Sequence, residues 1–516
     1  MDFISIFNDV LGPVMRGPSS SHTAGSYRIG LIARSLLGEE PSAAHLSFDP
    51  QGSYARTYQE QGADCGFAAG LLGWPITDGR FFHARELAAR EGLPIEFSVG
   101  PLQGATHPNT VDIRLTGRSG ETLRAVAQST GGGLVVFKRV NGWHVDITGK
   151  SYELLVGCDS SAGTPAAELV EGLTDITGKA DPEGTQTGRL LHFIGPTPVS
   201  EVTVSQIRCL PGVRFVREVV PVFFVQRGEP IVRNAAEMAA RAEARRVSLG
   251  RIALEFESIL LGFSEKEARQ EMLQRWDVMR TAVGDGLRDE AVRMKLLHPS
   301  AANILRAETE GRLAAGGLHG RAAARAMAGL HISSSGGVVC AAPTGASSGV
   351  LPGVLVTLEE EKKLSEENIA LAMFAAAAVG LVVARRATFA AEEAGCQVEI
   401  GAAGAMAAAA VVEATGGTAR QALDAAAVSL QNSMGSVCDL VQGICEVPCH
   451  TRTAAAAASA FICADLVLGG YVNPVPLDET VDAVYAVGKM LPPELRCTSL
   501  GGLAMTSAAR SMPRLR

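Results

Sequence analysis

Three cysteines in the last third of the chain have the residue type and the local context that suit a metal cofactor. Cys396, Cys438 and Cys449 each lie in a segment punctuated by Gly or Pro, between runs rich in alanine. A zinc site usually contains a CxxC pair or a nearby histidine, and here only His450 stands beside Cys449. Three thiolates without an obvious fourth instead suit a 4Fe-4S cluster that keeps one iron open as a Lewis acid. Sequence spacing alone leaves the kind of metal site open.

A second group of chemically useful residues lies near the start of the chain, in GPSSSHTAGSYRIG at positions 17 to 30. A helix needs one hydroxyl as its N-cap, whereas this segment supplies several hydroxyls and an imidazole before the helix begins. Because the first turn of a helix attracts anions, the surplus predicts a site for a substrate carboxylate. The alternative interpretation is an elaborate N-cap. The candidate residues are Ser19, Ser20, Ser21, His22 and Thr23.

A third candidate segment interrupts the helical pattern of the C-terminal half. Residues 333 to 355, SSSGGVVCAAPTGASSGVLPGVL, are rich in glycine and contain two prolines. Small side chains let backbone amides approach a ligand closely, although no lysine follows that would make the segment a P-loop. We weigh two interpretations equally: a loop where helices pack tightly, or a wall of the substrate or cluster site.

The elements expected to position these residues fall into two regions. Residues 1–150 alternate between strand and helix patterns, which predicts an α+β domain. Residues 151–228 repeat the pattern as a small ferredoxin-like module in β-α-β-β-α-β order, including a helix expected at 164–173. A charged linker is expected at 229–245. Residues 246–516 are predicted to form an all-α domain, with alanine-dense helices packed around a buried site.

Composition narrows the functional class. The chain has 516 residues, 47% hydrophobic and 19% charged content, a net charge of −8 and a pI near 5.8. These values describe a folded protein with no basic surface for nucleic acid, so small-molecule chemistry is expected. The most apolar window, 369–384, is shorter than the roughly 20 residues that span a bilayer, which favours a buried helix over a membrane segment. Ten cysteines and no signal-peptide pattern predict a reducing cytoplasm.

Motifs along nearly the whole chain carry a resemblance to one family. They are GPSSSHTAGSYRIG (17–30), GSYARTY (52–58), HPNT (107–110), GGG (131–133), AAPTGASSGVLPGVL (341–355), GCQVEIG (395–401), CDLVQGICEVPC (438–449) and TSLGGLA (498–504). The sequence resembles the iron-sulfur-dependent L-serine dehydratases, or L-serine ammonia-lyases, with the β and α parts fused in one chain.

The resemblance implies specific roles. Cys396, Cys438 and Cys449 would be the cluster ligands, His22 would be a base or carboxylate anchor, and residues 152–228 would be an ACT-like module. A homodimer and a small amino or hydroxy acid substrate are also implied, without nucleic acid or membrane partners. The remaining substrate-binding positions carried over are Asp64, Thr344, Ser347, Ser348 and Asn432.

Several positions depart from the family pattern. The family's GHGTD, whose histidine is a candidate base, is replaced by EQGAD at 60–64, and Gln61 cannot accept a proton, although Glu60 can substitute as a base. The family's NAS and EHN become residues 331–333 and 430–432, His450 follows the third ligand, and no cysteine follows Cys497. The ACT-like module lacks the DRPG turn, with residues 159–163 in its place.

Three functional hypotheses follow from this mixture of retained and altered residues. The first is dehydration of serine to pyruvate and ammonia. The second is the same cluster chemistry on another β-substituted amino or hydroxy acid, with elimination of water or sulfide, or isomerisation. The third is a non-catalytic amino-acid sensor with a vestigial cluster, against which the intact cysteines argue.

Overall fold

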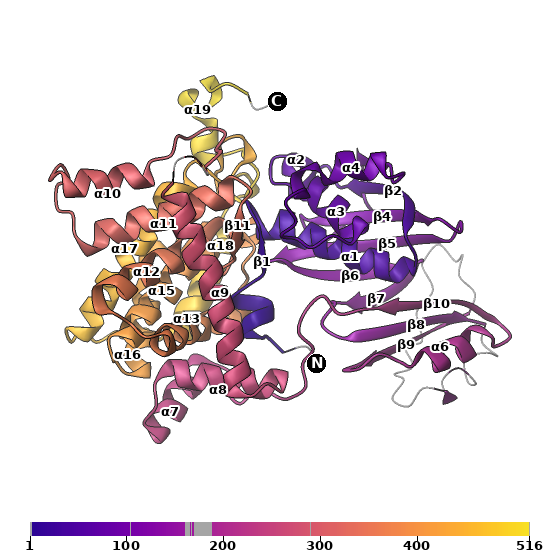
Figure 1. The fold of residues 1–516 in the computed structure, drawn as a ribbon, viewed down its shortest axis with the longest axis horizontal. Coiled ribbons are helices and arrows are strands. Elements are labelled where there is room, and N and C mark those ends of the chain that lie inside the picture. The colour runs from indigo at the N-terminus through magenta and orange to yellow at the C-terminus, as the bar shows by residue number, and fades with distance from the viewer. Residues whose placement is uncertain are drawn as a thin grey trace.

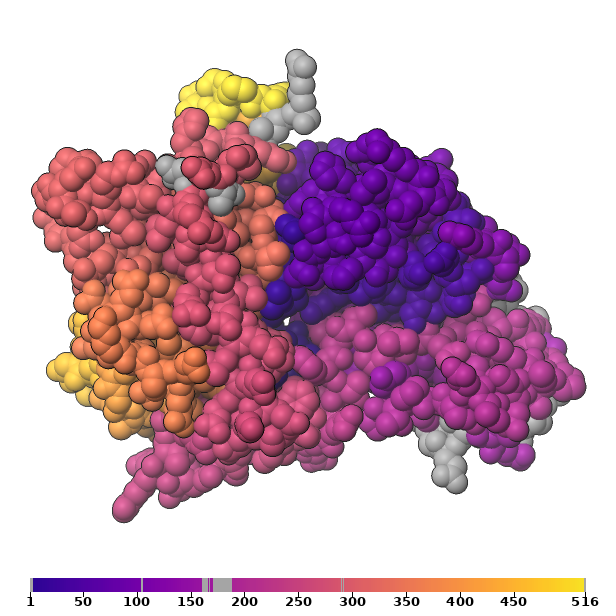
Figure 2. All heavy atoms as spheres, in the orientation of Figure 1, coloured from indigo at the N-terminus to yellow at the C-terminus, as the bar shows by residue number. Residues whose placement is uncertain are grey.

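The computed structural model describes residues 3–103, 105–159, 166, 168–169, 188–288, 290 and 292–514. The described chain forms an N-terminal α+β region and a largely helical C-terminal region, which confirms the two-region organisation predicted from the sequence. The helix expected at 164–173 lies almost wholly outside the described residues. Figure 2 shows the indigo and purple atoms of the first region meeting the rose and orange atoms of the second along one seam.

A six-stranded sheet forms the centre of the N-terminal region. Its order is β3-β2-β4-β5-β6-β7, and only the β2–β3 pair is parallel. Alternating residues of these strands point into an aromatic core that includes Phe48, Tyr54 and Phe67. The elements are α1 (Gly25–Leu37), β2 (Pro41–Phe48), α2 (Ser53–Thr57), α3 (Ala63–Leu72), α4 (Ala84–Arg90), β3 (Ile95–Val99), β4 (Thr110–Gly117), β5 (Thr122–Gly131), β6 (Leu134–Val140) and β7 (Trp143–Ile147).

A second, three-stranded sheet follows in the order β10-β8-β9, with both pairs antiparallel. It contains β8 (Tyr152–Cys158), β9 (Arg189–Gly195) and β10 (Val213–Val219), and α6 (Glu201–Arg208) packs on it. Ser200 caps α6 by accepting a hydrogen bond from the Thr203 amide.

Among the described residues of the C-terminal region, most helices pack around one apolar core (Figure 1). The expected linker at 229–245 includes helix α7, whose Met238 and Ala242 are buried in that core. The helices are α7 (Ala235–Arg245), α8 (Leu249–Leu261), α9 (Glu265–Gly286), α10 (Ala301–Thr309), α11 (Leu318–Ser334), α12 (Val350–Lys362), α13 (Glu366–Arg386), α14 (Ala391–Ala394), α15 (Ile400–Ala414), α16 (Ala419–Ser433), α17 (Cys449–Leu468), α18 (Leu477–Met490) and α19 (Ser507–Ser511).

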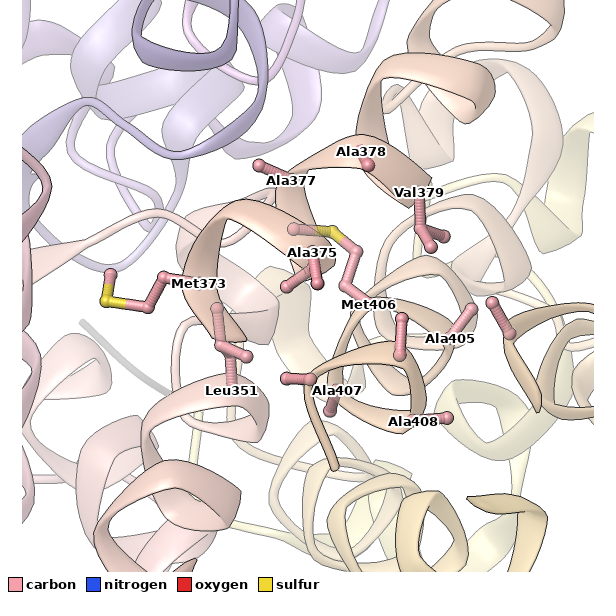
Figure 3. Close-up of a cluster of buried hydrophobic side chains, with 14 of the residues drawn as sticks. Leu351, Met373, Ala375, Ala377, Ala378, Val379, Ala405, Met406, Ala407 and Ala408 are labelled. Carbon is pink, nitrogen blue, oxygen red and sulfur yellow. The ribbon is translucent and has the colours of Figure 1, made fainter. Parts of the chain in front are cut away.

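Alanine allows the central helices to approach one another closely. Helices α13 and α15 pack against each other, and Met406 of α15 extends towards Ala375 of α13, whereas Met373 points away from α15 (Figure 3). By length and composition, three helical stretches among the described residues could cross a membrane: α13, residues 396–414 and α17. The first two have 78% and 89% of their most apolar window buried inside the protein, and α17 has 39%.

The first residues of the chain belong to the packing of the helical region rather than to the first sheet. A single π-helical turn, η1 (Ile6–Val10), contacts the helical core through Phe7 and Val10. The buried carboxylate of Glu257 in α8 binds this turn: it accepts hydrogen bonds from the Ser5 hydroxyl and from the backbone amides of Ile6 and Phe7, at 2.6–2.9 Å. Strand β1 (Val14–Arg16) then pairs antiparallel with β11 (Val338–Cys340). The chain therefore ties its two regions together before α1 begins.

Candidate active site at the junction of the two regions

Five buried cysteines gather on one side of the helical core, next to the N-terminal region. None is more than 5% exposed, and all belong to one small apolar cluster with Leu330, Ala346 and Ile400. The set contains the three predicted ligands together with two further thiols: Cys396, Cys438, Cys445, Cys449 and Cys497. The structure therefore brings together the three cysteines singled out in the sequence.

Short segments at helix ends position these thiols. Cys396 opens a 3-10 turn after Gly395, whose φ of +76° favours glycine. Cys438 lies beyond α16, and Cys449 is the first residue of α17. The backbone of Cys438 forms two hydrogen bonds with the C-terminal segment. Its amide donates to the carbonyl of Leu495 at 2.8 Å, and its carbonyl accepts from the amide of Cys497 at 3.0 Å.

The surroundings of the sulfur atoms favour the thiolate of Cys396. A hydrogen bond with Cys438 lowers the pKa of Cys396, against the opposing effect of burial, and the same bond raises the pKa of Cys438. The guanidinium of Arg452 also favours the thiolate of Cys396. It is held by Asp439 Oδ1 at 2.9 Å and by Val437 O at 2.8 Å.

The loop before Cys449 is held in place by the carboxylate of Glu446, which binds backbone amides of another segment. Glu446, only 2% exposed, accepts hydrogen bonds from three successive amides, those of residues 295–297, at 2.7–2.8 Å. Cys445 contacts Cys449, and that contact, together with burial, raises the pKa of the Cys445 thiol well above its usual range. Glu446 therefore attaches the cysteine loop to the segment after α9.

The donors present fit an iron-sulfur cluster better than a single ion. Within the part of the chain that the structure describes, no three His, Cys, Asp or Glu side chains converge on one point as ligands of one metal ion do. Cluster ligands bind different irons, so they need not converge on a point. Several thiols in apolar surroundings beside a positive charge are the donor set that such clusters use.

The hydroxyl-rich segment forms a buried turn, η2 (Ser20–Ala24), that leads into α1. Ser19 caps it by accepting a hydrogen bond from the His22 amide at 3.1 Å. The Ser21 hydroxyl donates to Glu392 Oε1 in α14 at 2.7 Å, and Thr23 donates to the carbonyl of Gln61 at 2.8 Å. The segment is thus an N-cap and also a contact between the two regions.

His22 is completely buried at this contact, and its two ring nitrogens face different groups. Nδ1 lies 3.1 Å from Ser21 Oγ and 3.6 Å from Glu392 Oε1, whereas Nε2 lies 3.0 Å from the hydroxyl of Thr57 and 3.3 Å from that of Ser53. Burial lowers the pKa of His22 to about 4, with Glu392 opposing the shift. The imidazole is therefore neutral near pH 7 and can accept a proton.

The three polar residues of the segment 60–64 lie in different places. Gln61 is buried, and its amide lies 3.8 Å from the sulfur of Cys497. Glu60 lines a cleft of about 220 Å³ at the seam, with Arg293 and Lys295 opposite and Cys445 at its wall. Asp64 faces Arg85 on the other side, and burial raises the pKa of its carboxyl.

The hydroxyls of the glycine-rich segment are largely committed to its own turn. Thr344 and Ser347 bond each other at 3.0 Å, and Ser348 donates to the carbonyl of Gly345 at 2.8 Å. Thr344 also bonds Glu399, which lies near Cys396. Asn432 lies apart, in a cleft of about 260 Å³ between α15, α16 and α17 whose lining includes Cys396.

Sequence reasoning missed several residues that the fold brings to this site. Glu392, Ser53 and Thr57 contact His22, and Cys445 and Cys497 join the predicted thiols. A pair of acids immediately before the first ligand segment, in AEEAGC, was a visible signal for Glu392. The two hydroxyls of α2 lie in the GSYARTY motif of the family resemblance, but that motif alone assigned them no role.

Comparison with known proteins identifies the family. The family model described as serine dehydratase alpha chain matches residues 202–504, more than half of the chain. The chain therefore belongs to the serine dehydratase family.

The matches extend over both regions. The chain is 35% identical over 280 residues to the probable L-serine dehydratase alpha chain of Bacillus subtilis, covering 54% of this chain and 93% of that protein. It is 34% identical over 285 residues to the L-serine dehydratase alpha chain of Peptoniphilus asaccharolyticus, covering 55% and 98%. Its N-terminal part is similar to the probable beta chain of Bacillus subtilis, with 41% identity over 166 residues, covering 32% and 73%. One polypeptide thus combines parts similar to both chains.

Proposed function

We propose that this chain is an iron-sulfur-dependent L-serine dehydratase that removes water from L-serine and yields pyruvate and ammonia. The observation that carries the proposal is the place of the buried, neutral imidazole of His22, whose neighbour Ser53 reaches the carbonyl of Cys497 in the thiol cluster where the β-like and α-like parts join. The relatives named as L-serine dehydratases supply the substrate and the reaction. Matches to both types of chain support a complete site in one polypeptide.

Cys396, Cys438 and Cys449 would hold a 4Fe-4S cluster. Their burial and the charge of Arg452 support the role, because thiolates in an apolar wall need a compensating positive charge. When bound, the cluster would supply a Lewis-acidic iron for the hydroxyl of the substrate.

His22 would take the α-proton of serine at Nε2. The electron pair of the Cα–H bond then forms the double bond, and hydroxide leaves the β-carbon with the electrons of the C–O bond. The resulting enamine, 2-aminoacrylate, tautomerises and hydrolyses in water. Gln61 cannot replace His22, because its amide does not accept a proton near pH 7. Of the two carboxylates in that segment, Glu60 lines the seam cleft, whereas Asp64 faces Arg85.

The substrate would enter through the seam cleft. Arg293 and Lys295 line its mouth, and their charges attract a carboxylate. Ser19, Ser20 and Thr23 of the buried turn remain candidates for binding the substrate, with Ser21, Asp64, Thr344, Ser347, Ser348 and Asn432 as further proposed contacts.

A second candidate function is the same chemistry on a different β-substituted amino or hydroxy acid, with loss of water or sulfide, or isomerisation. Two observations favour it. Gln61 offers an amide to the Cys497 sulfur where the family usually has a histidine, and Glu392 takes the hydroxyl of Ser21 that would otherwise bind a substrate carboxylate. Both change the polarity of the site.

Anaerobic purification followed by a substrate panel tests the proposal. We expect the broad visible absorbance of a 4Fe-4S centre and pyruvate release from serine, measured beside threonine, cysteine and other β-substituted acids. A cluster spectrum with inert serine would reject serine dehydration and favour the second candidate. Cys438→Ala should lose the absorbance, while Cys463→Ala, which removes a buried thiol of α17 outside the cysteine cluster, should keep it. Unchanged iron in Cys438→Ala would refute the ligand assignment.

We further propose an ACT-like module at 152–228 and a cytoplasmic homodimer. The strand order β10-β8-β9 supports the ACT-like module. β8 is the first strand of this segment, and the later strands β9 and β10 pair with it on either side, as in ferredoxin-like sheets.

Exposed apolar side chains on and after α17 support a homodimer interface; they are Ile462, Leu466 and Val472. Light scattering of wild type and Leu466→Glu measures the association, and a monomeric wild type would refute it.

A further inference from the structure

Two adjacent glutamates of α14 face opposite directions, and only one of them faces the imidazole of the site. Glu393 bonds outward, to His107 Nε2 at 3.3 Å and to Lys489 Nζ at 2.9 Å. Glu392 faces inward, with its side chain 3% exposed, and accepts hydrogen bonds from Ser21 at 2.7 Å and from the Asn109 amide at 3.2 Å. A buried carboxylate is costly unless it is well bonded, so its position needs a reason.

The hydrogen bonds of Glu392 determine where the proton of His22 resides. An ionised carboxylate only accepts, so the Ser21 O–H must point at Glu392. The Ser21 oxygen then offers His22 Nδ1 only lone pairs across 3.1 Å, and Ser19 Oγ, the other hydroxyl near Nδ1, lies farther away at 3.4 Å. This arrangement favours the hydrogen on Nδ1. A neutral imidazole has one N–H, so Nε2 is left as the acceptor.

The unprotonated nitrogen faces the thiol site. Nε2 lies 3.0 Å from the Thr57 hydroxyl and 3.3 Å from the Ser53 hydroxyl of α2. Each hydroxyl also reaches a carbonyl, Thr57 that of Ser53 at 3.1 Å and Ser53 that of Cys497 at 3.4 Å, and the nearer Thr57 hydroxyl can donate to Nε2 instead. The edge of the His22 ring packs against Tyr54, with centroids 5.1 Å apart, so the imidazole cannot turn freely. Burial lowers the pKa of His22 to about 4 and keeps it neutral near pH 7.

We propose that Glu392 is the positioning residue of His22: it fixes the Nδ1–H tautomer through Ser21 and leaves Nε2 as the base. When Nε2 takes a proton, Glu392 faces the resulting imidazolium across 3.6 Å and stabilises it. The catalytic part of this inference rests on the proposed serine dehydration, whereas the tautomer does not. Orientation of an imidazole by a buried carboxylate is a recurring device in proton transfer.

The conservative pair Glu392→Gln and Glu393→Gln tests the proposal, because the two acids are neighbours and differ in what they face. A glutamine at 392 is uncharged, so the Ser21 hydroxyl is no longer held by a carboxylate and donates to His22 Nδ1, which moves the imidazole proton to Nε2. In ¹⁵N NMR of the anaerobic holoenzyme labelled at histidine, assigned with His22→Gln, we expect protonated Nδ1 in wild type and in Glu393→Gln. In Glu392→Gln we expect protonated Nε2.

Kinetics with serine deuterated at Cα provide the second measurement. Glu392→Gln should lower kcat about 10²-fold, within the range that a general base contributes, with KM changed by less than about threefold. Its deuterium isotope effect on kcat should rise, because proton removal becomes rate-limiting, whereas a purely structural defect would leave that effect unchanged. Glu392→Asp should recover part of kcat, and visible absorbance checks that each variant keeps its cluster.

The outcomes separate the two hypotheses. If wild type does not consume serine, the proposed function fails and the NMR comparison alone decides the tautomer. Protonated Nδ1 in Glu392→Gln would overturn the inference, as would equal losses of kcat in both glutamine variants with an unchanged isotope effect.

Discussion

Replacing Gly353 by alanine tests whether the glycine-rich segment 333–355 serves helix packing. Gly353 lies in α12, where a Cβ would stand 2.5, 2.7 and 2.8 Å from the N, Cα and Cβ of Ala326 in α11. Real Cβ atoms do not approach this closely, and neither helix has a flexible side chain there that could yield. An alanine in a helix gains about 1 kcal/mol over glycine, whereas overpacking costs about 1–3 kcal/mol.

Because the clash is with backbone, we expect the upper end of that cost and a net destabilisation of about 1–2 kcal/mol for Gly353→Ala. The matched control is Gly284→Ala in α9, where a Cβ meets nothing within 4 Å and the propensity gain of up to about 1 kcal/mol should appear alone. Urea unfolding followed by far-UV circular dichroism measures both shifts against wild type. A Gly353→Ala protein that unfolds at or above the wild-type midpoint would refute the packing argument.

Two further predictions concern carboxylates beside the site. Glu446→Gln leaves the amides of 295–297 facing a neutral group with one acceptor oxygen. We therefore expect the free energy of unfolding in urea to fall by about 1.5–3 kcal/mol and the iron content to fall as well. Full iron retention would contradict the anchoring role. The hydrogen bond with His107 lowers the pKa of Glu393 to about 2. Stability from this group is therefore present above the unfolded pKa near 4.5 and is lost as the pH falls towards 2. Because Glu393 is partly exposed, solvent screening reduces this contribution, and we expect Glu393→Gln to lower the free energy of unfolding by about 1–2 kcal/mol at pH 7. The difference between mutant and wild type should vanish on acidification, and a difference that stays constant with pH would refute the lowered pKa of Glu393.

The helical region was predictable because its physical signal is local. Alanine density and helical periodicity in the runs near 367–390 and 402–415 depend on neighbouring residues only, and they became α13 and α15. Alternation in residues 1–150 likewise indicated strands, and this region contains the six-stranded sheet.

The site was predictable only in part, because its contacts join distant segments. Cys396 and the cysteines of 438–449 stood out by residue type. The expectation that they share one cofactor was enough to predict that they lie close together. The bond between Ser21 and Glu392 joins residues 371 positions apart, and the contact between Gln61 and Cys497 joins residues 436 apart. Such pairs follow from how the two regions dock, which depends on the whole topology rather than on any local pattern.

The N-terminal arm has a consequence for how a two-part protein stays assembled. Residues 3–16 insert η1 into the helical core and add β1 to β11, so the β-like part grips the α-like part without using the connection between them. In the relatives from Bacillus subtilis the two parts are separate chains. Residues 3–16 therefore hold the two parts together by non-covalent contacts, and joining the parts in one chain only raises their effective concentration for each other. A nick anywhere in residues 220–234 would leave the two halves of this protein bound to each other.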